Sequence, residues 1–191
     1  MSFNCIQKKI WEHKEFFVLA ILVFALYSLI SFPNHYFFRT SSTDLGAKTQ
    51  ALYSVITGKI PMYRFGGNYE VNTFADHFSP ILFLFAPFVL LFGSYTLLGI
   101  QVVFLIIGGL GVYKYALYKS EQNKILSVII SAFYFCSFGV INALEYDAHY
   151  NVIVAGLVSY VILYYEKNKK GPLIFFFLLI ILAKENMSFW L

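Results

Sequence analysis

Acidic residues and histidines that could do chemistry occur at a few separate positions in a chain that has few charged residues. The first is Asp44, in the sequence Ser-Ser-Thr-Asp-Leu-Gly. A carboxylate at this point suits the cap or first turn of a helix, and it also suits a general base or a metal ligand. We predict that Asp44 is the catalytic residue.

The second point is the adjacent pair Asp76 and His77, which comes shortly before Pro80. Asp76 could cap the following helix, and His77 could be an ordinary polar side chain at a membrane interface. An adjacent acid and imidazole are costly to desolvate at a lipid boundary without a partner. The functional alternative is that Asp76 binds substrate and His77 binds a metal ion.

The third point is the short acidic stretch that holds Glu145, Asp147 and His149. Glu145 and His149 share one face if the stretch is helical, and Glu145 and Asp147 share one face if it is extended. Carboxylates with an imidazole suit Mg²⁺ or Mn²⁺, although a plain solvated loop is the alternative. The pattern predicts a divalent cation held by Glu145, Asp147 and His77, with His149 near the substrate.

The last point is the pair Lys184 and Glu185, directly after the apolar run 173–183. Lys184 could simply extend its ammonium out of the apolar phase at the end of a helix. It could also contact a lipid-linked phosphate, for which a compact ammonium is a common partner. We treat both residues as candidate substrate-binding groups.

The composition indicates an integral membrane protein. The chain is 59% hydrophobic and only 13% charged, whereas about a quarter of a soluble domain is charged. The net charge of +4 is modest and forms no basic stripe, so we expect no nucleic-acid partner. Cys5 and Cys136 lie far apart, and we expect both to be inert thiols without a disulfide.

Apolar runs predict an all-α, polytopic membrane protein that forms one membrane domain over residues 1–191. A helix needs about 20 apolar residues to cross the hydrocarbon, with about 17 as the short limit. A long polar stretch, residues 33–80, separates the first run from the others. The predicted spans are 16–32, 95–113, 125–141, 152–165 and 173–183.

The run 81–92 decides the topology, because it is short and contains Pro87. If it crosses the membrane, ten Lys and Arg fall outside and four inside, against the usual positive-inside bias. If it lies at the outer surface, nine Lys are cytoplasmic. The second arrangement predicts a multi-pass protein of the cell membrane with a cytoplasmic N-terminus, and it gathers the acidic and His residues on the outer face.

The outer loop 33–80 is expected to hold a short amphipathic helix on the membrane surface. Ser42 or Thr43 could cap it, and Gly58 should end it. Its apolar face would be supplied by Leu45, Leu52, Val55 and Ile56.

Four motifs occur here in the order in which a family of prokaryotic predicted membrane proteins of unknown function carries them. They are Phe-Arg-Thr-Ser-Ser-Thr-Asp-Leu-Gly at 38–46, Ala-Asp-His-Phe-Ser-Pro at 75–80, Leu-Glu-Tyr-Asp-Ala-His at 144–149 and Leu-Ala-Lys-Glu at 182–185. That family resembles the C-type glycosyltransferase superfamily, which includes protein mannosyltransferases and aminoarabinose transferases. The resemblance covers about residues 16–190.

The resemblance implies a membrane enzyme whose site faces outward and whose donor is a sugar linked to polyprenyl phosphate. Asp44 stands where the superfamily has its catalytic acid, and Lys184 stands where many members have a lysine close to the donor phosphate. The second acidic motif would be Glu145 with Asp147, although no Asp-x-Asp is present. Members of the superfamily are longer, so we expect this chain to be the N-terminal part of a longer fold.

Two other functions remain open from the sequence. A transporter would be expected to carry ionisable residues within its spans, and here the spans hold almost none. A truncated, inactive remnant of an enzyme is the third possibility. We therefore expect a glycosyltransferase-like protein with polyprenyl-phosphate sugar and membrane lipid as partners.

Overall fold

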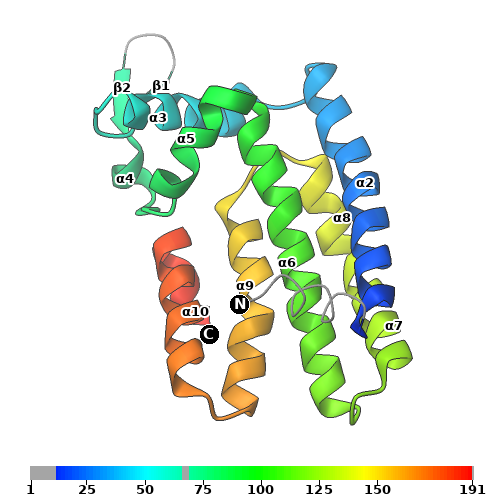
Figure 1. Ribbon diagram of the computed structural model, residues 1–191. Coiled ribbons are helices and arrows are strands. Elements are labelled where there is room, and N and C mark those ends of the chain that lie inside the picture. The colour runs from blue at the N-terminus through cyan, green and yellow to red at the C-terminus, as the bar shows by residue number, and fades with distance from the viewer. Residues whose placement is uncertain (1–11, 66–68, 191) are drawn as a thin grey trace.

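The computed structural model describes residues 12–65 and 69–190, so Cys5, Lys8 and Lys9 lie outside the described residues. The fold is all-α apart from one small hairpin, as predicted. Helices of different lengths run side by side as a bundle in Figure 1. They are α2 (Lys14–Tyr36), α6 (Tyr95–Lys119), α7 (Lys124–Phe135), α8 (Phe138–Glu145), α9 (Tyr150–Glu166) and α10 (Lys170–Ala183).

Helix length separates the bundle into two groups. Within the described residues, α2 and α6 are long and apolar enough to cross a membrane, and α7 with α8 forms a pair bent by 46° that would make a third span. Helices α9 and α10 are apolar but have only 17 and 14 residues. The five predicted spans therefore correspond to five helical segments, of which the last two are shorter than the usual span.

The helix that holds the first predicted span continues beyond residue 32, where that span was expected to end. Pro33 lies inside α2, which runs on to Tyr36. The carbonyl of Pro33 still accepts a hydrogen bond from the backbone N–H of Phe37. A proline removes only its own N–H from the helix ladder, so near the end of a helix it need not stop the last turn.

The polar stretch and the short apolar run together form a layer at one end of the bundle (Figure 1), which we call the end layer. It consists of a π-helix at Ser42–Gly46, α3 (Ala47–Ile56), β1 (Met62–Phe65), β2 (Tyr69–Asn72), α4 (Thr73–Asp76) and α5 (Leu82–Phe92). Helix α5 packs against α3 and α6. It ends at Gly93, whose φ of 54° suits a residue without a side chain.

The predicted amphipathic helix is present, with a different cap. The side chain of Ser41, rather than Ser42 or Thr43, accepts a hydrogen bond from the backbone N–H of Thr43. Leu45 and Leu52 are buried as predicted. The short antiparallel hairpin of β1 and β2 was not predicted, because strands of four residues in a polar stretch leave little periodicity to detect.

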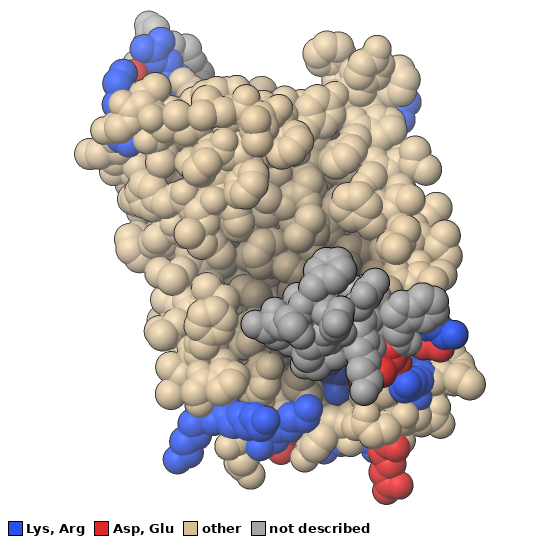
Figure 2. Space-filling model, viewed as in Figure 1, with Lys and Arg blue, Asp and Glu red and all other residues tan. Residues whose placement is uncertain are grey.

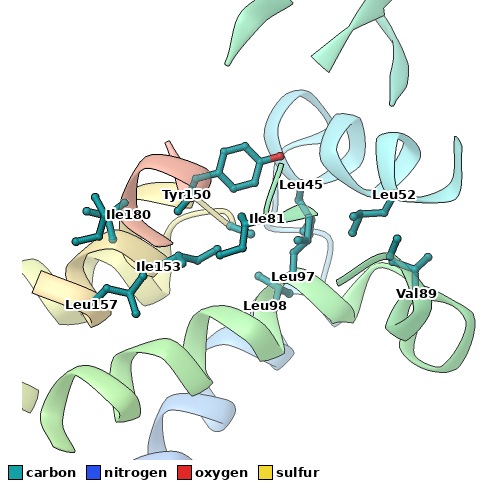
Figure 3. Packing of buried hydrophobic residues seen from close by; sticks show 14 residues of the cluster. Leu45, Leu52, Ile81, Val89, Leu97, Leu98, Tyr150, Ile153, Leu157 and Ile180 are labelled. Atoms are coloured by element: carbon teal, nitrogen blue, oxygen red, sulfur yellow. The ribbon is translucent and has the colours of Figure 1, made fainter. Parts of the chain in front are cut away.

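One apolar core joins the end layer to the bundle. Leu45 and Leu52 from the end layer lie over Val89 of α5 and Leu97 of α6 in Figure 3. The same cluster continues to Ile153, Leu157 and Ile180 at the other side of the view. The end layer is thus attached to the bundle by buried hydrophobic contacts as well as by the chain itself.

Charged side chains gather toward the two ends of the molecule, and uncharged ones cover most of the face between them (Figure 2). The end opposite the end layer holds the basic residues of the α6–α7 and α9–α10 connections, among them Lys119, Lys124 and Lys169. This distribution is the one expected of a membrane protein, whose middle faces hydrocarbon.

Candidate functional site

A polar pocket of about 190 Å³ lies where the end layer meets the start of α9 and the end of α10. We call it the polar pocket. It is lined by Thr43, Asp44, Ala47, Lys48, Tyr63, Thr73, Asp76, His77, His149, Tyr150, Asn151 and Lys184. Five of the eight predicted site residues line it, although more than a hundred positions separate the first of them from the last.

Lys48 lies at the centre of the polar contacts in this pocket. Its ammonium is 3.3 Å from a carboxylate oxygen of Asp44, one helical turn earlier. It also donates a 2.7 Å hydrogen bond to the carbonyl of Ala148 and lies 5.1 Å from the ring centre of Tyr150. The Lys48 side chain thereby bridges α3 and the segment that leads into α9.

Burial governs the protonation of the groups around Lys48. It lowers the pKa of Lys48, while the carboxylate of Asp44 opposes that shift. Burial also lowers the pKa of His149, and the positive charge of Lys48 adds to the effect. The pKa of Tyr63 is raised by burial and by the charge of Asp76. The pocket therefore favours neutral His149.

Asp147 does not line the polar pocket, but it holds a segment that leads into it. Its side chain is buried, and both of its carboxylate oxygens accept hydrogen bonds from the backbone N–H of Ser41, at 2.9 and 2.8 Å. Charge-assisted bonds of this kind are among the stronger ones in proteins. Asp147 thus fixes the start of the segment that carries Asp44, which is a positioning task and differs from the metal binding predicted for it.

Gln101 of α6 holds the same segment from the bundle side. Its side chain is buried, donates to the carbonyl of Ala143 at 2.6 Å and accepts from the backbone N–H of His149 at 3.2 Å. These two bonds join the end of α8 to the start of α9 across an irregular stretch. A buried amide inside a span is costly unless it is satisfied, so Gln101 has a structural reason to be there.

Glu145 lies apart from the polar pocket. It is exposed, ends α8 and lines a separate pocket with Arg39, Asn34 and Pro33. The stretch turns extended at Tyr146, so Glu145 and His149 do not share a helical face. His149 instead stacks on Tyr146, with 5.0 Å between the ring centres.

The predicted cation ligands are not brought together. Among the described residues, no group of three His, Cys, Asp or Glu side chains is arranged to hold a metal ion. Glu145 and His77 line different pockets, and Asp147 is engaged by Ser41. The trio of Glu145, Asp147 and His77 therefore does not form a ligand set in this structure, and cation binding stays a prediction.

The Asp76–His77 pair forms one rim of the polar pocket. Asp76 ends α4 and does not cap the next helix, because Asn72 caps α4 and no side chain caps α5. His77 lies 3.3 Å from a carboxylate oxygen of Glu185, which follows α10. Glu185 thus faces His77 at the rim, while its neighbour Lys184 lines the pocket itself.

Three residues that matter to this site were not singled out from the sequence: Lys48, Gln101 and Tyr63. Lys48 had a detectable signal, because it follows Asp44 by four positions on a predicted helix, the spacing of a favourable ion pair. Gln101 is a polar residue inside the predicted span 95–113. Tyr63 lies in the hairpin, which the sequence did not reveal.

Comparison with known proteins gives the family but no activity. The family model described as "Predicted membrane protein (DUF2079)" matches residues 34–191, which include every residue of the polar pocket. No curated protein and no solved structure matches the chain. The chain therefore belongs to this family of predicted membrane proteins.

Proposed function

We propose that the protein is a membrane glycosyltransferase that moves a sugar from a polyprenyl-phosphate donor to an acceptor at the outer surface of the cell membrane. The observation that carries the proposal is the polar pocket, in which a carboxylate and two lysines meet at one end of an apolar bundle. The resemblance of the family to the C-type glycosyltransferases supports the choice of reaction.

Asp44 is the general base of the proposed reaction. It takes the proton of the acceptor hydroxyl as the new bond forms between the acceptor oxygen and the anomeric carbon of the sugar. The bond between that carbon and the phosphate oxygen breaks, and the polyprenyl phosphate leaves with the electron pair. The Asp44 side chain keeps about a third of its surface exposed, which is compatible with access for an acceptor.

Lys48 and Lys184 bind the phosphate of the donor. Both residues line the polar pocket, and the charge of Lys184 contributes to lowering the pKa of Lys48, so the two ammonium groups are close enough to interact with one anion. An incoming phosphate competes with Asp44 for the ammonium of Lys48, which would free the carboxylate when the donor is bound. Cations placed where negative charge develops lower the barrier to departure of the leaving group.

The outward orientation rests on the distribution of lysine. Seven of the nine lysines that are expected to be cytoplasmic belong to the described residues, at the start of α2 and around the α6–α7 and α9–α10 connections, and the polar pocket lies at the other end of the bundle. The positive-inside bias then makes the end layer extracytoplasmic. This orientation exposes the pocket to acceptors outside the cell, with the N-terminus in the cytoplasm.

Asp44→Asn tests the proposal in the full chain reconstituted in liposomes. The donors are polyprenyl phosphates that carry mannose, glucose or aminoarabinose, an extract of the outer cell surface supplies the acceptor hydroxyl, and release of polyprenyl phosphate is followed. We expect the variant to lose about 100-fold or more of the transfer rate, the usual contribution of a general base. The matched control is Glu70→Gln, which alters an exposed acid of the hairpin and should keep the rate.

Two results would contradict the proposal. Transfer by Asp44→Asn at the unaltered rate would remove Asp44 from the mechanism. Failure of the unaltered chain to consume any of the donors, although polyprenyl phosphate binds, would exclude the proposed reaction.

A further inference from the structure

A third hollow, much larger than the polar pocket, lies on another side of the end layer and is lined almost entirely by apolar residues. It is an apolar groove of about 790 Å³ between α2, α5 and α6. Its lining includes Phe24 and Phe32 of α2, Phe88 and Phe92 of α5, and Gly99 and Val103 of α6. The proposed reaction makes no use of it. A cavity of this size and composition is typical of a site for an apolar ligand.

The groove exists because α5 has two unlike faces. Val89 is buried and faces Leu52 and Leu97 in the core shown in Figure 3. Phe88 and Phe92 lie one turn apart on a neighbouring face of the same helix and are about half exposed. Helix α5 packs on α3 and α6 and makes few contacts with α2, so a space remains between them.

Gly99 enlarges this space from the side of α6. A Cβ atom built at Gly99 would meet no other atom within 4 Å. By contrast, at Gly108 and Gly109, further along the same helix, a Cβ atom would run into Tyr134 and Phe135. The same helix therefore packs tightly at one end and leaves a hollow at the other.

The groove is continuous with the apolar surface that the bundle presents to the membrane. Phe24 and Val103, on the two helices long enough to span, are both exposed by more than 40%. An apolar hollow excludes water, and an empty one forfeits dispersion contacts along its walls. Hydrocarbon is the medium expected to cover this surface of a membrane protein, so a hydrocarbon chain would suit the groove.

A small polar cluster lies beside the groove, next to its lining residue Tyr95. His35 makes 2.7 Å hydrogen bonds to Ser94 through Nε2 and to Thr40 through Nδ1. It also meets the edge of Tyr95, a lining residue of the groove, with 4.7 Å between the ring centres. Tyrosine and histidine side chains of this kind suit the level of the lipid headgroups.

We infer that the groove binds one acyl chain of a membrane phospholipid, whose glycerol and headgroup lie at the level of His35 and Ser94. Phospholipid is the occupant because it is the bulk component of the surface with which the groove is continuous. The bound chain completes the packing between α2 and α5, which contact each other little. This inference is independent of the reaction proposed above.

The test uses the purified full chain in phospholipid nanodiscs that contain a trace of phosphatidylglycerol with a diazirine in the middle of one acyl chain. After illumination, mass spectrometry locates the cross-links. Gly99→Trp fills the groove from α6, and Gly139→Trp is the matched control, since a Cβ there also meets nothing within 4 Å but lies on α8. We expect cross-links on α2, α5 and α6 that fall at least about tenfold in Gly99→Trp and persist in Gly139→Trp.

Equal labelling of the groove in Gly99→Trp and in the control would overturn the inference, as would labelling spread evenly around the bundle. If Gly99→Trp does not fold, Gly99→Leu is compared with Gly139→Leu in the same way. Excess polyprenyl phosphate should leave the labelling unchanged, and displacement by it would overturn the choice of a phospholipid as the occupant.

Discussion

The contact between α6 and α9 and the polar pocket are held together by different means. Along α6 and α9, glycines let the two backbones approach closely, and Ser159 donates a 3.1 Å hydrogen bond to the carbonyl of Gly108. In the polar pocket, a few polar contacts join segments far apart in the chain. These are the bonds of Asp147 to Ser41 and of Lys48 to Asp44 and Ala148.

This difference predicts different responses to mutation. Lipid competes with helices for apolar contact, so helices in a membrane depend on shape and close approach. A small increase in side-chain size should therefore damage the α6–α9 contact. The polar pocket should instead be damaged by the loss of a single charged group, while the bundle below it stays folded.

Gly156→Ala should have the largest effect, and it should act on the whole bundle. A Cβ at Gly156 would collide with the backbone oxygen of Phe104, and a backbone atom cannot move aside without separating the helices. Overpacking of this kind costs about 1–3 kcal/mol and should lower the melting temperature in detergent by about 5 °C. The measurement is thermal unfolding followed by circular dichroism.

Gly139→Ala is the control for that experiment, because a Cβ there meets nothing within 4 Å. Alanine favours the helix more than glycine does, so this variant should melt no lower than the unaltered protein. A Gly156→Ala variant that melts with the unaltered protein would contradict the close approach of α6 and α9.

Asp147→Ala should have an effect that is confined to the segment beginning at Ser41 and does not spread through the bundle. It leaves the backbone N–H of Ser41 without its buried charged acceptor, at a cost of about 1–3 kcal/mol. Hydrogen exchange of residues 41–48 should become about tenfold faster, while the amides of α6 keep their protection. The exposed neighbour Glu145→Ala should leave both unchanged.

Two results would contradict the prediction for Asp147→Ala. Unchanged exchange at residues 41–48 would show that the hydrogen bonds to Ser41 do not hold this segment. Faster exchange throughout α6 would show that the pocket and the bundle are not separate in the way described.

The bundle was accessible to sequence analysis because its signal is local. Apolar runs mark the helices, and Leu45 and Leu52 repeat at the spacing of one helical face. The short run 81–92 was expected to lie at a surface, and α5 packs against α3 at the end that carries Asp44. The hairpin was missed because its strands are only four residues long.

The arrangement of the polar pocket was less accessible because its signal is not local. Asp44 and His149 were expected to come together, and they line one pocket. The role of Asp147 was not expected, since in an extended stretch the direction of a side chain depends on contacts with distant segments. Here the partner is Ser41, 106 positions away. Lys48 could have been found from its spacing to Asp44, but its bond to Ala148 could not.

His149→Gln should have the smallest effect, on the pH dependence of stability. The folded protein lowers the pKa of His149, so protons bind more readily to the unfolded chain. Stability from this source is present above the ordinary histidine pKa of about 6.5 and is lost as the pH falls below it. The variant should therefore lose less stability than the unaltered protein between neutral and mildly acidic pH.

His13→Gln serves as the control, because His13 lies at the start of α2, toward the other end of the bundle. Melting temperatures across that pH range provide the measurement. If His149→Gln and the unaltered protein lose stability in parallel, the pocket does not disfavour the charged imidazole.

We propose that the end layer, including α5, and the segment before α9 share one side of the membrane. Cysteine labelling in intact cells tests it, with Cys5 and Cys136 first replaced by serine and single cysteines placed at exposed positions. We expect Lys59→Cys and Tyr146→Cys to react with an impermeant maleimide from outside, and Lys124→Cys and Lys169→Cys to react only after permeabilisation. Labelling of positions 59 and 146 from opposite sides would mean that α5 crosses the membrane, and it would contradict the shared pocket.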